Sequence, residues 1–179
     1  MLADIFTPLP GRQDLADQLT DQHYEQLSAV LNAKQDGYDR SVIRALFAAH
    51  RAAQAGQMPT DAAVARYGVA LQSYSVRDAV WFAVDDGRLT GIALWVNLAR
   101  RLPNPYDAAP LFIAAWSTYR DGNGALAGIA AELALKSDPG YSAADLLLAA
   151  LARGLDPRTL PKLRLPAQSK GAAESDSNA

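Results

Sequence analysis

The residues that could support catalysis or metal binding are few and widely spaced. The chain contains two histidines, His23 and His50, and no cysteine. Without cysteine, disulfides, thiolate metal sites and cysteine nucleophiles are all excluded. Neither histidine has a second histidine or a carboxylate at the spacing of metal ligands, so we expect each to be a solvated or capping residue. The sequence therefore predicts no metal and no cofactor.

Two further patterns resemble functional motifs but lack essential parts. Asp85 and Asp86 are adjacent carboxylates, which a hard cation favours, but neighbouring residues on a helix point in different directions and Asp-Asp-Gly is a common helix end. Gly122-Asn123-Gly124 lacks the Lys-Ser/Thr of a phosphate loop and connects two expected helices, so a turn explains it better. The Gly-x-Ser-x-Gly motif of acyl transfer does not occur. We expect a protein that is not an enzyme.

Arginine and aromatic side chains supply the remaining candidates, because Arg, Trp and Tyr are enriched at protein interfaces. The aromatic residues concentrate in the second half of the chain, where Tyr106 follows an Asn-Pro pair in an expected loop. Arg100 and Arg101 are adjacent, and Arg120 follows in the next expected helix. The candidate partner-binding residues are Trp95, Arg100, Arg101, Tyr106 and Arg120.

Helices must position these side chains, since apolar residues recur at spacings of three and four and few segments alternate with period two. We expect helices over about 13–35, 40–55, 60–73, 75–84 and 90–101. The first should break near Thr20 and end at Gly37. Its apolar stripe consists of Leu15, Leu19, Leu27, Val30 and Leu31. Thr60 and Ser75 are expected N-caps of later helices, and Gly56 is expected to end the second.

The segment from Tyr106 to Leu155 predicts three more helices in close succession, around 111–119, 126–134 and 142–151. A helix, a short Gly turn, a second helix and then Asp-Pro is the order found in the tetratricopeptide repeat. Ala127, Ala134 and Pro139 have that repeat's small-residue and proline spacing. Since one such unit is visible and a solenoid needs about three, we expect a tetratricopeptide-like hairpin inside an all-α, multi-helix domain.

Composition and charge restrict the class of protein further. Half of the 179 residues are hydrophobic and 20% are charged, which is ordinary for a globular domain. The net charge of −2 makes nucleic acid an improbable partner, because phosphate contacts normally require a basic excess. The first residues do not resemble a signal peptide, and no apolar run approaches the ~20 residues of a membrane span. We expect an N-terminal helical segment over 1–57, a helical domain over 58–164 and a disordered tail over 165–179.

A series of short motifs extends from Met58 to Arg164. In chain order they are Val76-Arg77-Asp78-Ala79 with Trp81, Leu98-Ala99-Arg100-Arg101-Leu102-Pro103, Pro105-Tyr106, Ala109-Pro110, Ala115-Trp116, the turn at Gly122, Ala134-Leu135 and Asp138-Pro139-Gly140-Tyr141. This succession resembles the C-terminal half of the actinobacterial family called domain of unknown function 4192. Members of that family carry in addition an N-terminal half with strand-like segments, so the chain looks like a truncated homologue or the helical half alone. The resemblance implies an actinobacterial, cytoplasmic protein and brings no catalytic residue with it.

Three functions remain open at this point. The helix-repeat pattern and the lack of a catalytic set favour a non-enzymatic adaptor or scaffold that binds a protein partner or associates with itself. The first alternative is an accessory protein that binds nucleic acid through an arginine patch, such as Arg40, Arg44 and Arg51 on one helix face. The second is an enzyme or small-molecule binder with a pocket between helices.

Overall fold

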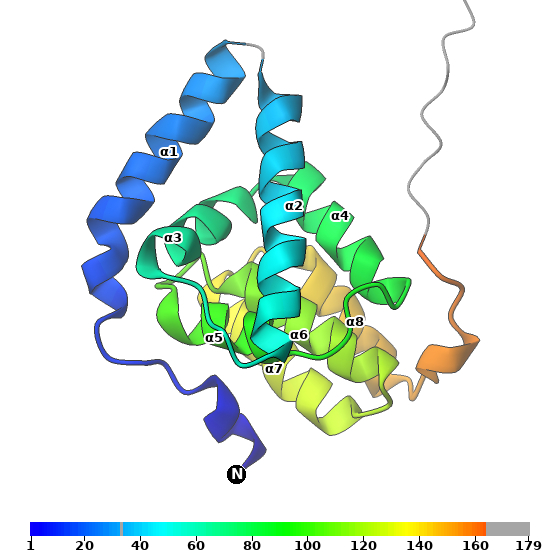
Figure 1. Ribbon diagram of the computed structural model, residues 1–179. Coiled ribbons are helices and arrows are strands. Elements are labelled where there is room, and N and C mark those ends of the chain that lie inside the picture. The colour runs from blue at the N-terminus through cyan, green and yellow to red at the C-terminus, as the bar shows by residue number, and fades with distance from the viewer. Residues whose placement is uncertain (33, 164–179) are drawn as a thin grey trace, which may run out of the picture.

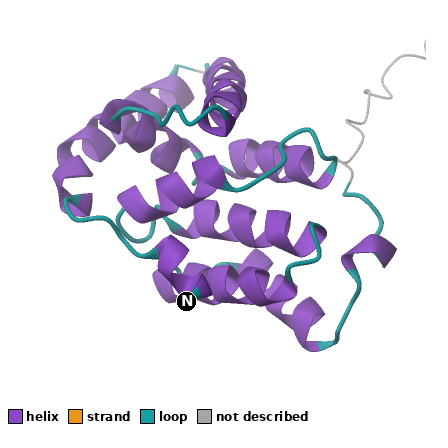
Figure 2. Cartoon of the chain, turned by 60° about the horizontal axis from the view of Figure 1, so that its bottom comes forward, coloured by secondary structure: helices purple, strands orange, loops and turns teal. Residues whose placement is uncertain are grey.

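The computed structural model describes residues 1–32 and 34–163, and this part of the chain consists of helices joined by loops, without a strand (Figure 2). The all-α fold predicted from the sequence is confirmed. The predicted tail falls outside the described residues. The α-helices are α1 (Ala16–Leu31), α2 (Gln35–Gln54), α3 (Asp61–Ala70), α4 (Tyr74–Asp85), α5 (Ala93–Arg101), α6 (Ala108–Arg120), α7 (Gly124–Ser137) and α8 (Ser142–Ala152). Three 3₁₀ helices are η1 (Leu2–Phe6), η2 (Arg12–Leu15) and η3 (Pro157–Thr159).

Helix α6 lies at the centre of the molecule. Every residue from 108 to 119 is buried, which requires neighbours on all sides of the helix. These neighbours are α4, α5, α7 and α8. The turn at Gly122, whose φ is 84°, brings α7 back against α6. Ala127 and Ala134 are fully buried on α7, as the hairpin pattern requires; kinship with the tetratricopeptide repeat itself stays a prediction.

Residues on both sides of the predicted boundary at 57 and 58 contribute to one hydrophobic core. Phe6, Leu15 and Leu19 from the first part are buried in the same cluster as Phe112 and Leu147. The two predicted segments therefore fold against each other, although the boundary itself is still a sequence-based prediction.

Helices α1 and α2 form an arm on the outside of this core. In Figure 1 the two helices meet at their upper ends and diverge towards the rest of the molecule, with α3 between them. Helix α1 packs mainly on α3, whereas α2 reaches α4 and α5 with Val42 and Leu46 fully buried. The end of α1 that follows Thr20 consequently has fewer neighbours than the other helices.

A buried carboxylate fastens the end of the described chain to the core. The Asp85 side chain, at the end of α4, accepts hydrogen bonds from Trp116 Nε1 at 3.0 Å and from the backbone N–H of Leu163 at 2.6 Å. It also pairs with Arg120 Nε at 3.1 Å. Arg120 in turn donates to the carbonyl of Pro157 at 2.6 Å. The residues after α8 are thus held by charged groups of α4 and α6.

Two predicted helix ends, the N-cap Thr60 and the glycine Gly56 after α2, are confirmed by the structure. Thr60 caps α3 by accepting from the backbone N–H of Ala63 at 3.4 Å. Gly56 follows α2 with φ at 81°, a left-handed conformation that other residues avoid.

Three predicted helix boundaries were wrong. Helix α1 continues through Thr20, whose hydroxyl donates to the carbonyl of Ala16 at 2.9 Å and does not cap a second helix. Gly37 lies inside the first turn of α2. Ser75 is not the N-cap of α4, because the N-cap residue is Ser73 and the Ser75 hydroxyl bonds to Asp39 on α2. Only for Ser75 is a contact with a distant residue, Asp39, involved.

Candidate partner-binding surface

An apolar strip along the outer half of α1 is exposed to solvent. Tyr24 is 69% exposed, Leu27 51% and Val30 53%. The spacing of three residues between them places all three on one side of a helix. The sequence predicted a single stripe facing the core, but in the structure its first part, Leu15 and Leu19, is buried while Leu27 and Val30 are not.

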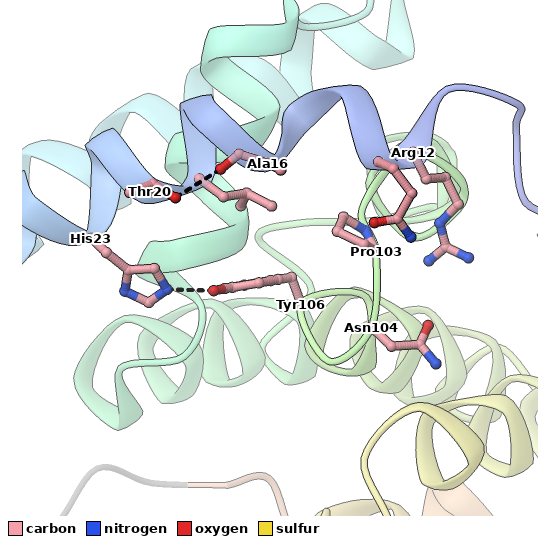
Figure 3. Close-up of a pocket in the computed structure, with 9 residues that line it drawn as sticks. Arg12, Ala16, Thr20, His23, Pro103, Asn104 and Tyr106 are labelled. Atoms are coloured by element: carbon pink, nitrogen blue, oxygen red, sulfur yellow. Dashed lines mark hydrogen bonds between the residues drawn. The ribbon is translucent and has the colours of Figure 1, made fainter.

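A cleft of about 560 Å³ lies at the inner end of this strip, between η2 and α1 on one side and the loop before α6 on the other. Figure 3 shows His23 and Tyr106 pointing towards one another across it. Its lining residues are Arg12, Gln13, Ala16, Leu19, Thr20, His23, Pro103, Asn104 and Tyr106. Thr20 and His23 also line the shallower hollow that contains Tyr24, Leu27 and Val30. Cleft and strip therefore form one continuous surface, which we call the α1 surface.

Two polar groups of α1 on this surface, those of Thr20 and His23, have partners within the molecule. His23 Nε2 lies 2.5 Å from the hydroxyl of Tyr106, and the two rings are 5.5 Å apart at a tilt of 57° (Figure 3). The Thr20 hydroxyl is satisfied by its own helix, as described above. Covering this face would therefore leave these two polar groups hydrogen-bonded, which removes the main cost of burying them.

A largely buried ion pair adjoins the cleft through Arg12, which lines it. Arg12 of η2 pairs with Asp107, which precedes α6, and both side chains are largely buried. Arg12 Nε also donates to the carbonyl of Leu102 at 2.5 Å, and the Ser137 hydroxyl bonds to the same Asp107 carboxylate. The Arg12 guanidinium is thus used in holding η2, α6 and α7 together, although it borders the cleft.

Charge on α1 is confined to places away from the strip. Asp17 and Asp21 are exposed near the beginning of the helix. Lys34 is exposed beyond its end and lines, together with Glu25, the hollow on the other side of α1. None of these three takes part in an ion pair with the described residues. Asp17 and Asp21 are separated by four residues, a spacing at which like charges repel.

The arginines predicted to bind a partner are engaged in contacts within the fold. Arg100 Nε donates to the carbonyl of Thr7 at 2.8 Å. Arg101 donates to the carbonyl of Pro59 at 2.7 Å and pairs with Asp61. Arg120 is bound to Asp85, as described above. The structure therefore does not bring these three arginines together as one free basic patch.

Of the two aromatic candidates, one lies on the α1 surface and one does not. Tyr106 is partly exposed and lines the cleft. Trp95 has an exposed fraction of 0% and lies in the core, with its ring 5.6 Å from that of His50. The selection of Trp95 was wrong as a surface residue, because α5 turns this tryptophan towards α2. Arg40, Arg44 and Arg51 are exposed on α2.

The side chains with clearly shifted pKa values are set apart from the α1 surface. Burial raises the pKa of Tyr67 and Tyr141 and lowers the pKa of His50. His50 is buried, and its Nε2 has no hydrogen-bond partner. Within residues 1–32 and 34–163, no group of three or more His, Asp or Glu side chains is arranged to hold a metal ion. None of the helices described is long and apolar enough to cross a bilayer.

Sequence reasoning missed the exposed strip because it treated all apolar residues of this helix as one buried stripe. A signal was present at positions 22 and 23. A buried stripe that continued from Leu19 would need an apolar residue there, and the sequence has Gln22 and His23. The polar interruption marks the place where α1 leaves the core.

Comparison with known protein families identifies the family of this chain. A family model described as domain of unknown function (DUF4192) matches residues 2–158. The match covers the N-terminal helices as well as the part from residue 58 onward where the motifs indicated a resemblance. No curated protein and no solved structure matches the chain.

Proposed function

The chain belongs to the family described as domain of unknown function 4192, and we propose that it is a non-enzymatic adaptor or scaffold that binds a protein partner through the α1 surface. We further propose that it works in the cytoplasm of an actinobacterium. The location rests on the family resemblance together with the absence of cysteine, which suits a reducing compartment.

One observation carries this proposal: three large apolar side chains are exposed side by side on one helix. Single exposed apolar residues are common on proteins, whereas a contiguous group marks an interaction site or a liability to aggregate. Tyr24 is the type of residue that anchors interfaces, since it contributes a large apolar area with a polar tip.

The shape of the surface indicates how a partner would bind. Apolar residues at intervals of three or four along a helix form the usual contact of helix-on-helix recognition. The adjoining cleft offers room beside Tyr106 for a further side chain of the partner. An amphipathic helix fits such a surface better than an extended strand, because no sheet edge is present in the described residues.

Site-specific photo-crosslinking in cells tests the proposal. A benzophenone side chain placed at Leu27 should yield a discrete crosslinked protein, identified by mass spectrometry. The matched control places the same group at Glu25, which lines the hollow on the other side of α1. The proposal requires that the product at Leu27 be stronger than at Glu25 and be lost when Val30→Asp is added. Equal or absent crosslinking at the two positions would contradict it.

A further inference from the structure

A row of arginines lies along the outer side of α2. Arg40, Arg44 and Arg51 are all exposed to solvent. A helix turns by about 100° per residue, so the three side chains leave α2 within about 40° of one another. They extend over about 16 Å along the helix. These residues therefore form one charged stripe, which we call the α2 arginine row.

The positive charge of this row is not compensated within the fold. None of its three arginines takes part in an ion pair with the described residues. Arg44 Nε donates to the carbonyl of Arg40 at 3.2 Å, a contact inside the helix that leaves both charges in place. Like charges separated by four residues on a helix repel one another. An anionic partner would relieve this repulsion.

A fourth arginine fills the gap between Arg44 and Arg51. Phe47 lies between these two on the same side of α2, three residues after one and four before the other. The Arg88 guanidinium, from the loop after α4, lies over the Phe47 ring at 5.9 Å from its centre. The ion pair of Arg88 with Asp86, at 3.5 Å, is at the surface and therefore weak. Positive charge thus recurs at each turn of α2 from residue 40 to residue 51.

The surroundings of the row restrict the kind of anion that fits it. Glu25 and Asp36 line the same hollow as Arg40, and Asp86 lies beside Arg88. A nucleic-acid duplex presents phosphates over a broad surface and would meet these carboxylates, and the net charge of −2 opposes it further. A single helix, with a diameter of about 10–12 Å, is narrow enough to contact the row alone. We infer that the α2 arginine row binds an acidic helical segment of a protein partner.

The spacing of the row matches one face of such a helix. The charges along α2 follow one another at intervals of four, three and four residues, a pattern that reads the same in both directions. Glutamates at these intervals share one face of a helix, so each would meet a guanidinium whichever way the segment runs. An extended chain presents side chains on one face at an even spacing of about 6.6 Å and would lose the register at the middle interval. Each guanidinium can bind a carboxylate through two parallel hydrogen bonds.

Fluorescence anisotropy with a synthetic peptide tests the inference. The peptide is an alanine-rich helix of about 20 residues with four glutamates at intervals of four, three and four. A control peptide of the same composition has them at intervals of two, five and two, which divides them between two faces. The first peptide should bind about tenfold more tightly, because the control loses two of the four ion pairs. Equal affinity for both peptides would overturn the inference.

Charge-matched variants locate the site on the protein. Arg40→Gln with Arg44→Gln removes two charges from the row and should weaken peptide binding about tenfold. Arg153→Gln with Arg158→Gln removes the same charge from exposed positions elsewhere, and should leave the affinity within about twofold of wild type. Equal weakening by the two double variants would indicate a general charge effect and overturn the inference.

The site on α2 and the proposed function can fail separately, because they use different helices. Leu27→Ala, on the α1 surface, should bind the peptide as the wild type does, whatever the outcome of the Leu27 crosslink. A short DNA duplex that displaces the peptide and binds more tightly than it does would overturn the inference in favour of nucleic acid. Lack of peptide binding at about 50 mM salt with about 1 mM protein would overturn it as well.

Discussion

Replacing Asp85 by alanine should strongly destabilise the protein. The Asp85 side chain is fully buried in its ion pair with Arg120, and it also accepts from Trp116 and from the backbone of Leu163. Alanine removes all three interactions at once. Arg120, whose side chain is itself largely buried, is then left without its carboxylate. The substitution therefore leaves an uncompensated buried charge, which is the costly way to break an ion pair.

The expected loss follows from the class of interaction. Removing one partner of a buried ion pair lowers the free energy of unfolding by about 3–5 kcal/mol. The hydrogen bond of the Trp116 indole to a charged acceptor belongs to the group worth about 1.5–3 kcal/mol, but these terms share one carboxylate and do not add. We therefore expect a total near 4 kcal/mol, which is a large share of the ~5–15 kcal/mol typical of a domain.

Urea unfolding followed by circular dichroism measures this loss, and the neighbouring residue supplies the control. Asp86→Ala changes the same side chain one position later, where the carboxylate is substantially exposed and lies 3.5 Å from Arg88. That surface pair should be worth less than about 1 kcal/mol. Limited proteolysis should in addition cut Asp85→Ala near residues 155–163 faster than wild type, because Leu163 and Arg120 lose their common partner. A loss below about 1 kcal/mol for Asp85→Ala, or equal losses for both variants, would refute the reasoning.

Two further predictions concern helix packing and pH. Gly128→Ala in α7 should raise the free energy of unfolding by about 0.5–1 kcal/mol, because the new methyl group would lie 3.9 Å from Leu151 without a clash. Gly68→Ala in α3 should lower the free energy of unfolding by about 1–3 kcal/mol. Its methyl group would lie 2.5 Å from the side chain of Leu102, which is fully buried. Urea midpoints of the two variants should shift in opposite directions, and a shift in the same direction would show that the space around them does not decide the outcome. The second prediction concerns pH. Burial lowers the pKa of His50 in the folded protein, whereas the unfolded chain has a histidine pKa near 6.5. The unfolded chain therefore takes up a proton first as the pH falls, and the folded state loses stability below about pH 6.5. His50→Gln should reduce the fall in urea midpoint between about pH 7.5 and about pH 5.5, while His23→Gln, an exposed histidine, should retain it; an unchanged pH dependence in His50→Gln would contradict the assignment.

The helices themselves could be predicted from the sequence because each depends on local periodicity and on a few residues at its ends. Helix α6 shows both the success and its limit. Its apolar content predicted a helix, but its burial on all sides depends on four other helices that no local pattern specifies. Packing between helices that are distant in the sequence therefore could not be predicted from local patterns.

The functional surface was harder to predict, for the same physical reason. An exposed and a buried apolar stripe have the same spacing, so Leu27 and Val30 could not be distinguished from Leu15 and Leu19 by periodicity alone. Trp95 was selected as a surface anchor although α5 turns it into the core. The partners of Arg101 and Arg120 lie 35 or more residues away along the chain, too far for spacing to reveal.

Hydrogen–deuterium exchange of the wild-type protein, alone and bound to the protein captured by the Leu27 photo-crosslink, tests the central claim most directly. Association through the α1 surface predicts that amides between Thr20 and Leu31 exchange more slowly in the complex, since the partner suppresses local opening of α1. Amides of α7, away from this surface, should exchange at the same rate in both samples. Unchanged exchange along α1, or protection confined to another helix, would contradict the claim that the partner binds the α1 surface.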